Sequence, residues 1–367
     1  MEAKEYVEGL VEKARVAQKV IEGYTQEQVD VLCREIAKTV YDNAELLARM
    51  AVDETRMGVY ENKVSKNMGK ARVIWNDMKH GKSVGIINRY PEKGIIEVAK
   101  PMGVVAAITP TTNPIVTPMC NAIIVGPHPR SKACSTKTVE LINERLAKLG
   151  APENLIQCVP EPTMEISGLL MKTCDVVLAT GGPGVVKAAY SSGKPSYGVG
   201  AGNVQCILDE DVDYAKVVPM IIDGRCFDNG IICSGEQNAI TPASKVDELV
   251  AEYKKNHGVL IDDPAQVDAL RSAMFPGGVM NKDLVGQSAL KVAAAAGIDV
   301  PEDTRVLLVK APAYGKDDYF SEEKMCPVMA LYTYDTWDEA IAIADANLSV
   351  AGRGHSVAIH SNNQSHI

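Results

Sequence analysis

The sequence lacks the residue spacings by which proteins hold zinc or build disulfide frameworks. It has nine cysteines and six histidines, but no Cys-x-x-Cys pair and no His-Glu-x-x-His segment. An odd number of irregularly spaced cysteines also argues against a set of disulfides. We therefore expect no metal site, and we interpret most of the cysteines as small buried apolar side chains.

A basic surface and a long apolar run are also absent. Acidic residues outnumber basic ones by 47 to 38, and the net charge of −9 disfavours nucleic acid as a partner. No run of about 18 apolar residues occurs, so no membrane span is expected. The opening segment MEAKEYVEGLVEKARVAQKV has the pattern of a charged amphipathic helix and not of a secretory signal. We therefore expect a cytoplasmic protein that binds neither nucleic acid nor membrane.

The 367 residues are of ordinary globular composition, 46% hydrophobic and 23% charged, and their number predicts two domains or one large α/β unit. Helical apolar spacing predicts helices over 3–22, 26–41 and 43–57, the last with Asn43 as its N-cap. Residues 82–101 contain two β-branched runs around the turn-forming sequence YPEKG, which indicates a hairpin. We expect this hairpin to pair with another subunit.

From residue 103 onward, apolar runs of strand length alternate with helical segments. These runs are GVVAAITP, IIVGPHP, LIQCVP, DVVLATGG and VQCILDED, and a second alternation follows from residue 238 onward. Strands that are apolar throughout and alternate with helices are typical of a parallel sheet covered on both faces. The sequence therefore predicts doubly wound α/β architecture with a nucleotide-binding domain.

The segment between Pro110 and Ile123 is short for a crossover between parallel strands. A crossover needs a helix and loops, at least about 10–12 residues. A helix beginning near Pro114 would run directly into the strand at Ile123. Either this helix is very short or residues are missing between Ala122 and Ile123.

Five segments together resemble the CoA-acylating branch of the aldehyde dehydrogenase superfamily. They are ITPTTNP, GPHPR, ATGGPGVVKAAYSSGKPSYGVGAGN, FDNGIICSGEQ and EEKMCPV, beginning at residues 108, 126, 179, 227 and 322. They occur in the family's order. The likeness is strongest to members that act on succinate semialdehyde, and the family is normally longer both before Ile123 and beyond Ile367.

The resemblance implies an aldehyde dehydrogenase-like α/β fold with two doubly wound domains and an oligomerisation hairpin. Residues 1–200 would form the NAD(P)-binding domain, with the N-terminal helices and the hairpin near 82–101. Residues 201–367 would form the catalytic domain with its cysteine. The resemblance also implies NADP(H) or NAD(H) as cofactor, coenzyme A as co-substrate, and a homodimer or higher homo-oligomer.

Cys233 and Asn113 are the predicted catalytic residues. Cys233 lies between an Asn-Gly and a Ser-Gly pair, so its thiol is expected at a bend and not inside an element. A thiolate adds to an aldehyde and leaves again from a thioester. The resemblance makes the Asn113 amide an oxyanion donor, with the Cys233 backbone N–H as the second. A packed thiol and a helix-capping Asn are the alternatives.

The predicted cofactor contacts begin at a glycine-rich turn. Thr180, Gly181 and Gly182 follow a strand and open a helix, whose N-terminus favours a pyrophosphate, although such a turn can be merely structural. The Arg130 guanidinium could pair with the 2′-phosphate of NADP(H), or it could be a solvated surface group. The sequence therefore allows either NADP(H) or NAD(H) as the cofactor. The resemblance adds Thr111, His128 and Pro129, and it adds Glu323 as the acceptor for the nicotinamide ribose hydroxyls.

Two further positions bear on the substrate. Hydrolytic family members carry a glutamate base in an E-L-G-G-K segment, and the resemblance aligns Gly198, which we also group with the cofactor contacts, at the position of this base. Without a base to activate water, coenzyme A becomes the expected acyl acceptor. Arg225 is a candidate for binding the distal carboxylate of the substrate, with a surface ion pair as the alternative.

The preferred reaction interconverts succinate semialdehyde, coenzyme A and NAD(P)+ with succinyl-CoA and NAD(P)H through a thioester on Cys233. Acetaldehyde or sulfoacetaldehyde is the alternative within the same class of enzyme. A catalytically silent dinucleotide-binding structural subunit and an inactive fragment are the alternatives outside it.

Overall fold

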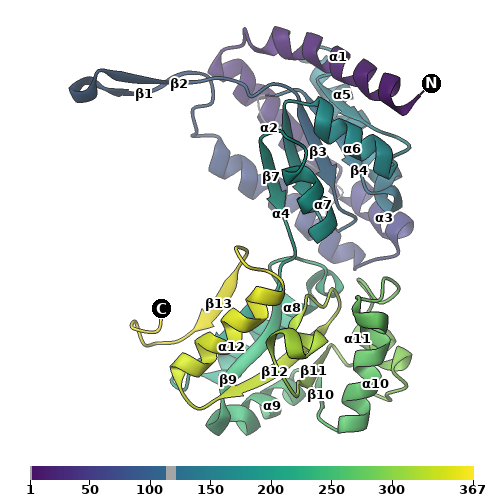
Figure 1. Cartoon of the computed structure of the whole chain (residues 1–367), viewed down its shortest axis with the longest axis vertical. Helices are drawn as coiled ribbons and strands as arrows, with labels where there is room; N and C mark the ends of the chain where they lie inside the picture. The colour runs from purple at the N-terminus through teal and green to yellow at the C-terminus, as the bar shows by residue number, and fades with distance from the viewer. Residues whose placement is uncertain (1, 113–120) are drawn as a thin grey trace. The chain divides into compact units, whose positions relative to one another are not determined.

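A computed structural model describes residues 2–112 and 121–367, and these form two compact units (Figure 1). The N-terminal unit consists of Met1–Arg56 and Tyr60–Gly200. The C-terminal unit consists of Met57–Val59 and Ala201–Ile367. The assignment of the first to cofactor binding and of the second to catalysis remains a proposal.

Four helices open the N-terminal unit: α1 (Ala3–Ile21), α2 (Gln26–Asp42), α3 (Ala44–Thr55) and α4 (Tyr60–Met78). The first three were predicted. The side chains that α4 buries include Lys63, Lys66 and Asn67, so the apolar period that signals a helix is absent there. Asn43 occupies the N-cap position of α3 without a capping hydrogen bond, because its Nδ2 donates to the Thr39 carbonyl at 2.8 Å.

The predicted hairpin is confirmed as β1 (Gly85–Tyr90) paired antiparallel with β2 (Ile95–Ala99). A 3-10 turn over Pro91–Lys93 joins the strands, and Gly94 closes it with φ of 65°, in the left-handed region that glycine adopts most easily. The hairpin projects from the rest of its unit (Figure 1). It exposes Ile95 and Ile96, and its contact with another subunit remains a prediction.

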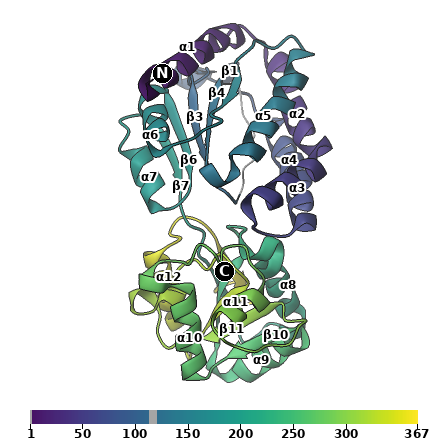
Figure 2. The same ribbon diagram turned by 90° about the vertical axis from the view of Figure 1, so that its right-hand side faces the viewer.

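A five-stranded parallel sheet forms the centre of the N-terminal unit, in the order β5-β4-β3-β6-β7. Its strands are β3 (Val105–Thr109), β4 (Ile123–Pro127), β5 (Ile156–Cys158), β6 (Val176–Thr180) and β7 (Ser196–Val199). Helices α6 (Met164–Thr173) and α7 (Pro183–Tyr190) lie on one side of it, and α5 (Lys132–Ala147) lies on the other with α2 (Figure 2). The crossover between β3 and β4 lies outside the described residues.

The C-terminal unit has a six-stranded parallel sheet in the order β10-β11-β12-β9-β8-β13. Its strands are β8 (Val204–Leu208), β9 (Glu236–Pro242), β10 (Gly258–Ile261), β11 (Val306–Lys310), β12 (Val328–Tyr334) and β13 (Val357–His360). Its helices are α8 (Tyr214–Cys226), α9 (Val246–Lys255), α10 (Pro264–Met274), α11 (Ala289–Ala295) and α12 (Trp337–Val350).

The strands β8 to β12 each contribute side chains to two cores, because successive side chains point to opposite faces. In β11, Val306 and Leu308 belong to the core under α8 and α9. Leu307 and Val309 belong to the core under α10, α11 and α12. Both faces of the sheet are thus covered, which confirms the doubly wound fold predicted from the apolar runs.

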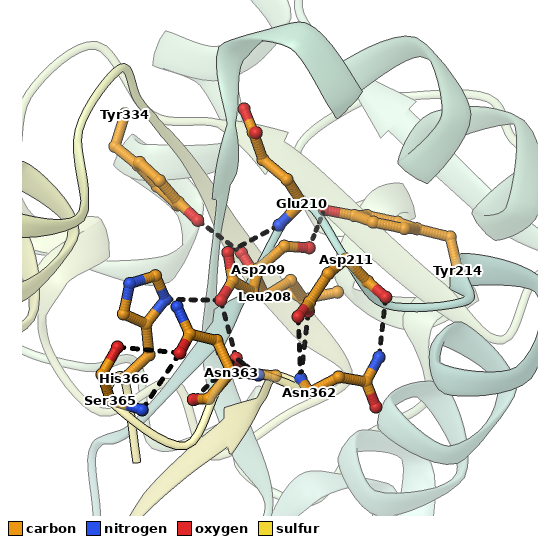
Figure 3. A network of polar contacts seen from close by, with 11 residues as sticks. Leu208, Asp209, Glu210, Asp211, Tyr214, Tyr334, Asn362, Asn363, Ser365 and His366 are labelled. Atoms are coloured by element: carbon orange, nitrogen blue, oxygen red, sulfur yellow. Dashed lines mark hydrogen bonds and ion pairs between the residues drawn. The ribbon is translucent and has the colours of Figure 1, made fainter.

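The last residues of the chain are fastened to the loop after β8 (Figure 3). His366 Nδ1 lies 2.6 Å from the Asp209 carboxylate, and the imidazole stacks on Trp337 with ring centroids 4.1 Å apart. The Asn362 backbone N–H donates to Asp211 at 3.0 Å.

Across the part of the chain that is described, no helix combines the length and apolar character needed to cross a membrane.

Candidate active site

The N-terminal unit brings most of the predicted cofactor residues to one edge of its sheet. Thr109 at the end of β3 pairs with Pro127 at the end of β4, and Ile108 pairs with Ala179 in β6. Because the strands are parallel, the residues that follow them meet at this edge. These residues include Thr111, His128, Pro129, Arg130, Thr180, Gly181 and Gly182.

The strand order also marks where a ligand belongs at this edge. The chain moves outward from β3 through β4 to β5 and then returns to place β6 on the other side of β3. Open parallel sheets bind ligands at such a reversal, beyond the carboxyl ends of the two strands. Thr111 follows β3, and Thr180 is the last residue of β6.

The turn after β6 has the room that a pyrophosphate needs. Gly182 is the N-cap of α7, and Pro183 occupies the first turn, where a missing N–H costs nothing. No described atom lies within 4 Å of the position that a Cβ would take on Gly182 or on Gly184. The open glycines and the helix N-terminus together fit a bound diphosphate.

His128 and Arg130 lie in the 3-10 turn that precedes α5. The Arg130 backbone N–H donates to His128 Nδ1 at 3.1 Å, which fixes the imidazole against the turn. Both residues are exposed. This placement is compatible with both hypotheses for Arg130, a contact with a 2′-phosphate and a solvated side chain.

Gly198 faces helix α7. A Cβ on Gly198 would lie 2.7 Å from a Tyr190 ring carbon and 2.8 Å from a Val186 methyl, so a side chain there would require Tyr190 and Val186 to shift. The next residue, Val199, is 42% exposed and points to the opposite face of the sheet. Neither residue has a basic or acidic side chain. The lack of a water-activating base at the end of β7 remains a prediction.

In the C-terminal unit, the chain before Cys233 makes a turn of three successive left-handed residues. Asp228, Asn229 and Gly230 have φ of 54°, 51° and 74°, a conformation that Asn, Asp and Gly adopt most readily. The Asp228 carboxylate accepts from the Val59 N–H at 2.9 Å. The Asn229 amide donates to the Gly286 carbonyl at 3.0 Å. The FDNG sequence is thereby explained as a turn that sets the approach to the cysteine.

Cys233 is the exposed member of the cysteines that the structure describes. Burial raises the pKa of six other thiols: to about 12 for Cys134 and Cys174, to about 11 for Cys158, Cys226 and Cys326, and well above its ordinary value for Cys206. Since the thiolate is the nucleophilic form, these six are poor nucleophiles at neutral pH. Cys120 lies outside the described residues.

Cys233, Gly202 and Glu323 lie close together where the amino ends of three neighbouring strands meet. They precede β9, β8 and β12, which are adjacent in the sheet. The Gly202 N–H donates to Glu323 Oε1 at 3.1 Å, and a Cβ on Gly202 would overlap the Cys233 carbonyl oxygen. Burial raises the pKa of Glu323 above its usual range, and the hydrogen bond from Gly202 offsets part of that rise.

Arg225 does not reach solvent. Its side chain is fully buried at the end of α8, and each of its three guanidinium nitrogens donates to backbone carbonyls. This environment favours a structural role over the substrate contact predicted for Arg225, and it is not the surface ion pair considered as the alternative.

The sequence analysis did not single out Lys324, which is also fully buried. Its Nζ donates to Asn238 Oδ1 at 3.0 Å and to the Phe320 and Glu322 carbonyls at 2.6 and 2.9 Å. Its backbone N–H donates to Gln237 Oε1 at 2.9 Å. Burial lowers the pKa of Lys324 to about 7. A lysine after two glutamates looks like a solvated residue, so the sequence carries no signal of this burial.

The two predicted catalytic residues differ in what the structure says of them. Cys233 is placed beside Gly202 and Glu323, whereas Asn113 lies outside the described residues. The oxyanion role of Asn113 therefore remains a prediction.

A model of the aldehyde dehydrogenase family matches residues 1–281. The chain is 51% identical to a Clostridium kluyveri protein named succinate-semialdehyde dehydrogenase (acetylating), over 98% of this chain and 82% of that protein. An acetylating aldehyde dehydrogenase structure from Geobacillus thermoglucosidasius has a TM-score of 0.94 and 38% identity, covering 99% of this chain and 83% of that one. A Rhodopseudomonas palustris propionaldehyde dehydrogenase with bound propionyl-CoA has a TM-score of 0.84 and 32% identity, covering 98% and 81%.

The exposure of Cys233 predicts selective alkylation. With one equivalent of iodoacetamide near pH 8, we expect peptide mapping to find the label on Cys233. The labelled fraction of Cys233 should exceed that of each buried thiol by at least about tenfold, because a thiol of pKa 11 is less than about 1% thiolate at this pH. A Cys233→Ser variant should lose this rapid phase. Labelling of Cys226 or Cys158 before Cys233 would contradict the placement.

The burial of Lys324 predicts a pH dependence of stability. The folded pKa of about 7 lies below the ordinary value of 10.5, so the unfolded chain binds the extra proton between these values and stability rises with pH. We expect the unfolding free energy of the wild type to gain about 1 kcal/mol over Lys324→Met between about pH 7.5 and 8.5. Urea unfolding followed by Trp337 fluorescence, with Trp75→Phe in both proteins, measures it. An unchanged difference between the two proteins would mean that Lys324 stays charged.

Proposed function

The chain belongs to the aldehyde dehydrogenase family, and we propose that it is a CoA-acylating member that interconverts succinate semialdehyde and succinyl-CoA. The reaction is succinate semialdehyde + CoA + NAD(P)+ ⇌ succinyl-CoA + NAD(P)H + H+. The observation that carries the proposal is the exposed Cys233, whose carbonyl packs against Gly202, the residue that binds Glu323. The likeness to the Clostridium kluyveri enzyme supports the choice of aldehyde.

The residues of the chain fit a nicotinamide dinucleotide. The open turn at Gly182 and the N-terminus of α7 suit its diphosphate, and Glu323 offers Oε2 to a ribose hydroxyl while Gly202 occupies Oε1. The nicotinamide ring supplies the acceptor, or in reverse the donor, of a hydride. The contacts assigned to Thr111, His128, Pro129 and Gly198 are part of the same proposal.

Cys233 performs the covalent chemistry. Its thiolate adds to the aldehyde carbon and gives a thiohemiacetal, whose oxyanion the Cys233 backbone N–H and the Asn113 amide are proposed to stabilise. One such donor is worth about 3–4 kcal/mol in the transition state. Loss of hydride from the carbon leaves a thioester on Cys233. The thiolate of coenzyme A then attacks this thioester, takes the acyl group and releases the Cys233 sulfur.

The absence of a base at the end of β7 favours transfer to coenzyme A over hydrolysis. Neither Gly198 nor Val199 can remove a proton from water, so water remains a weak nucleophile at the thioester. A thiol of ordinary pKa supplies its own thiolate at neutral pH and needs less help. Acyl transfer between two sulfur atoms is also close to balanced in energy, which makes the reaction usable in either direction.

We propose a homodimer or higher homo-oligomer in which the β1–β2 hairpin contacts another copy of the chain. The exposed apolar side chains of the hairpin support this proposal, since water-exposed isoleucines on a projecting two-stranded sheet gain stability from cover. A silent dinucleotide-binding subunit remains the alternative from another class. Reduced-cofactor oxidation by an acyl-CoA, sensitive to thiol reagents, would exclude it.

The substrate proposal is tested by comparing acyl-CoA thioesters in steady-state reduction with both cofactors. We expect kcat/KM for succinyl-CoA to exceed that for acetyl-CoA by at least about tenfold, equivalent to about 1.4 kcal/mol of transition-state binding. Propionyl-CoA is the matched apolar control. A preference for acetyl-CoA would replace succinate semialdehyde with acetaldehyde as the substrate.

The 2′-phosphate role of Arg130 is tested with Arg130→Ala. If the guanidinium binds that phosphate, the ratio of kcat/KM for NADPH to that for NADH should fall about tenfold or more, because a charge-assisted hydrogen bond is worth about 1.5–3 kcal/mol. Lys137→Ala, which removes a positive charge from the exposed side of α5, is the control. An unchanged ratio would leave Arg130 as a solvated side chain.

A further inference from the structure

We propose that Arg225 is a positioning residue that fixes the separation between the Cys233 sulfur and the Glu323 carboxylate, and thereby the geometry of hydride transfer. This inference rests on the function proposed above for these two groups. In this proposal, the buried Arg225 guanidinium links two segments that are distant in the sequence.

The first segment held by Arg225 is the chain around the nucleophile. Nη2 donates to the Gly230 carbonyl at 2.9 Å, and Nη1 donates to the Glu236 carbonyl at 3.2 Å. These two carbonyls stand three residues before and three residues after Cys233. The guanidinium therefore ties both ends of the turn that carries the thiol.

The second segment is the chain around Glu323. Nε donates to the Cys326 carbonyl at 3.0 Å, and Nη2 donates to the carbonyls of Lys324 and Cys326. Lys324 is the neighbour of Glu323, and its own side chain fastens the same segment to β9 through Asn238. One planar group thus spans the nucleophile segment and the Glu323 segment.

The geometry of this contact specifies arginine. Donors on three nitrogens of a rigid plane point in different directions, and a lysine ammonium, a single point of charge, cannot reach both segments in the same way. The contact is also close-packed. A Cβ on Gly230 would overlap Arg225 Nη2, so neither the turn nor the guanidinium has room to shift independently.

The reaction has one step that depends on the separation of the two segments. Glu323 would hold the ribose of the nicotinamide, and hydride transfer would require the carbon bound to Cys233 to lie close to that ring. A misplacement of about 1 Å can cost about 100-fold in rate. Alkylation of Cys233 by a small reagent needs the thiol but not Glu323. The two rates therefore respond differently to a loss of coupling.

The test compares Arg225→Lys with the wild type and with Arg305→Lys. Arg305 pairs with Asp223 on the exposed side of α8 and is the matched control. In single-turnover oxidation of succinate semialdehyde, we expect Arg225→Lys to form NAD(P)H about 100-fold more slowly per active thiol than the wild type does. We also expect the primary deuterium isotope effect, measured with the 1-deuterated aldehyde, to be larger in the variant than in the wild type. The iodoacetamide rate at Cys233 should stay within about twofold of the wild type.

The outcomes separate the possible failures. Unchanged hydride transfer in Arg225→Lys, or an equal fall in hydride transfer and alkylation, would overturn the positioning role. Arg225→Gln, which keeps a shorter planar amide, serves as a second variant if the lysine variant does not melt cooperatively. If neither folds while Arg305→Lys does, Arg225 is required for folding and the proposal is wrong. A wild type without turnover would instead reject the proposed function.

Discussion

The site depends on a close backbone contact between Gly202 and Cys233, which only a glycine at position 202 allows. The carbonyl of Cys233 lies where a Cβ of Gly202 would be, and the N–H of the same glycine holds Glu323. Cys233, the proposed nucleophile, and the Glu323 carboxylate come from different loops, and the backbone of Gly202 contacts both residues. Three adjacent parallel strands, β8, β9 and β12, begin at this point. A displacement of any of the three loops that precede them would therefore also displace a strand of the sheet.

Two buried basic side chains, Arg225 and Lys324, stabilise the loops around this contact. The hydrogen bonds of these two side chains run to backbone carbonyls and to one side-chain amide oxygen. A buried charge without acceptors would cost several kcal/mol, so the loops are held in the conformation that presents these oxygens. Charge burial here acts on backbone geometry more than on substrate recognition.

Much of the architecture could be predicted because it depends on repeated patterns. Apolar runs of strand length predicted both sheets, and the turn residues of the hairpin predicted β1 and β2. Helix α4 could not be predicted, because it buries Lys63 and Asn67 and so lacks an apolar period. The long-range contacts of Arg225 and Lys324 leave no local pattern either. Cys233 was predicted because the residues around it form a motif, whereas the close approach of Gly198 to α7 has no signal in the sequence.

The central claim is that the acyl group is carried by Cys233. The most direct measurement mixes the protein with succinyl-CoA in the absence of reduced cofactor and locates the adduct by mass spectrometry of the intact chain and its peptides. The account predicts one succinyl group on Cys233, removed again by added coenzyme A. Its central claim would be contradicted by an adduct at another residue, or by a Cys233→Ser variant that still turns over.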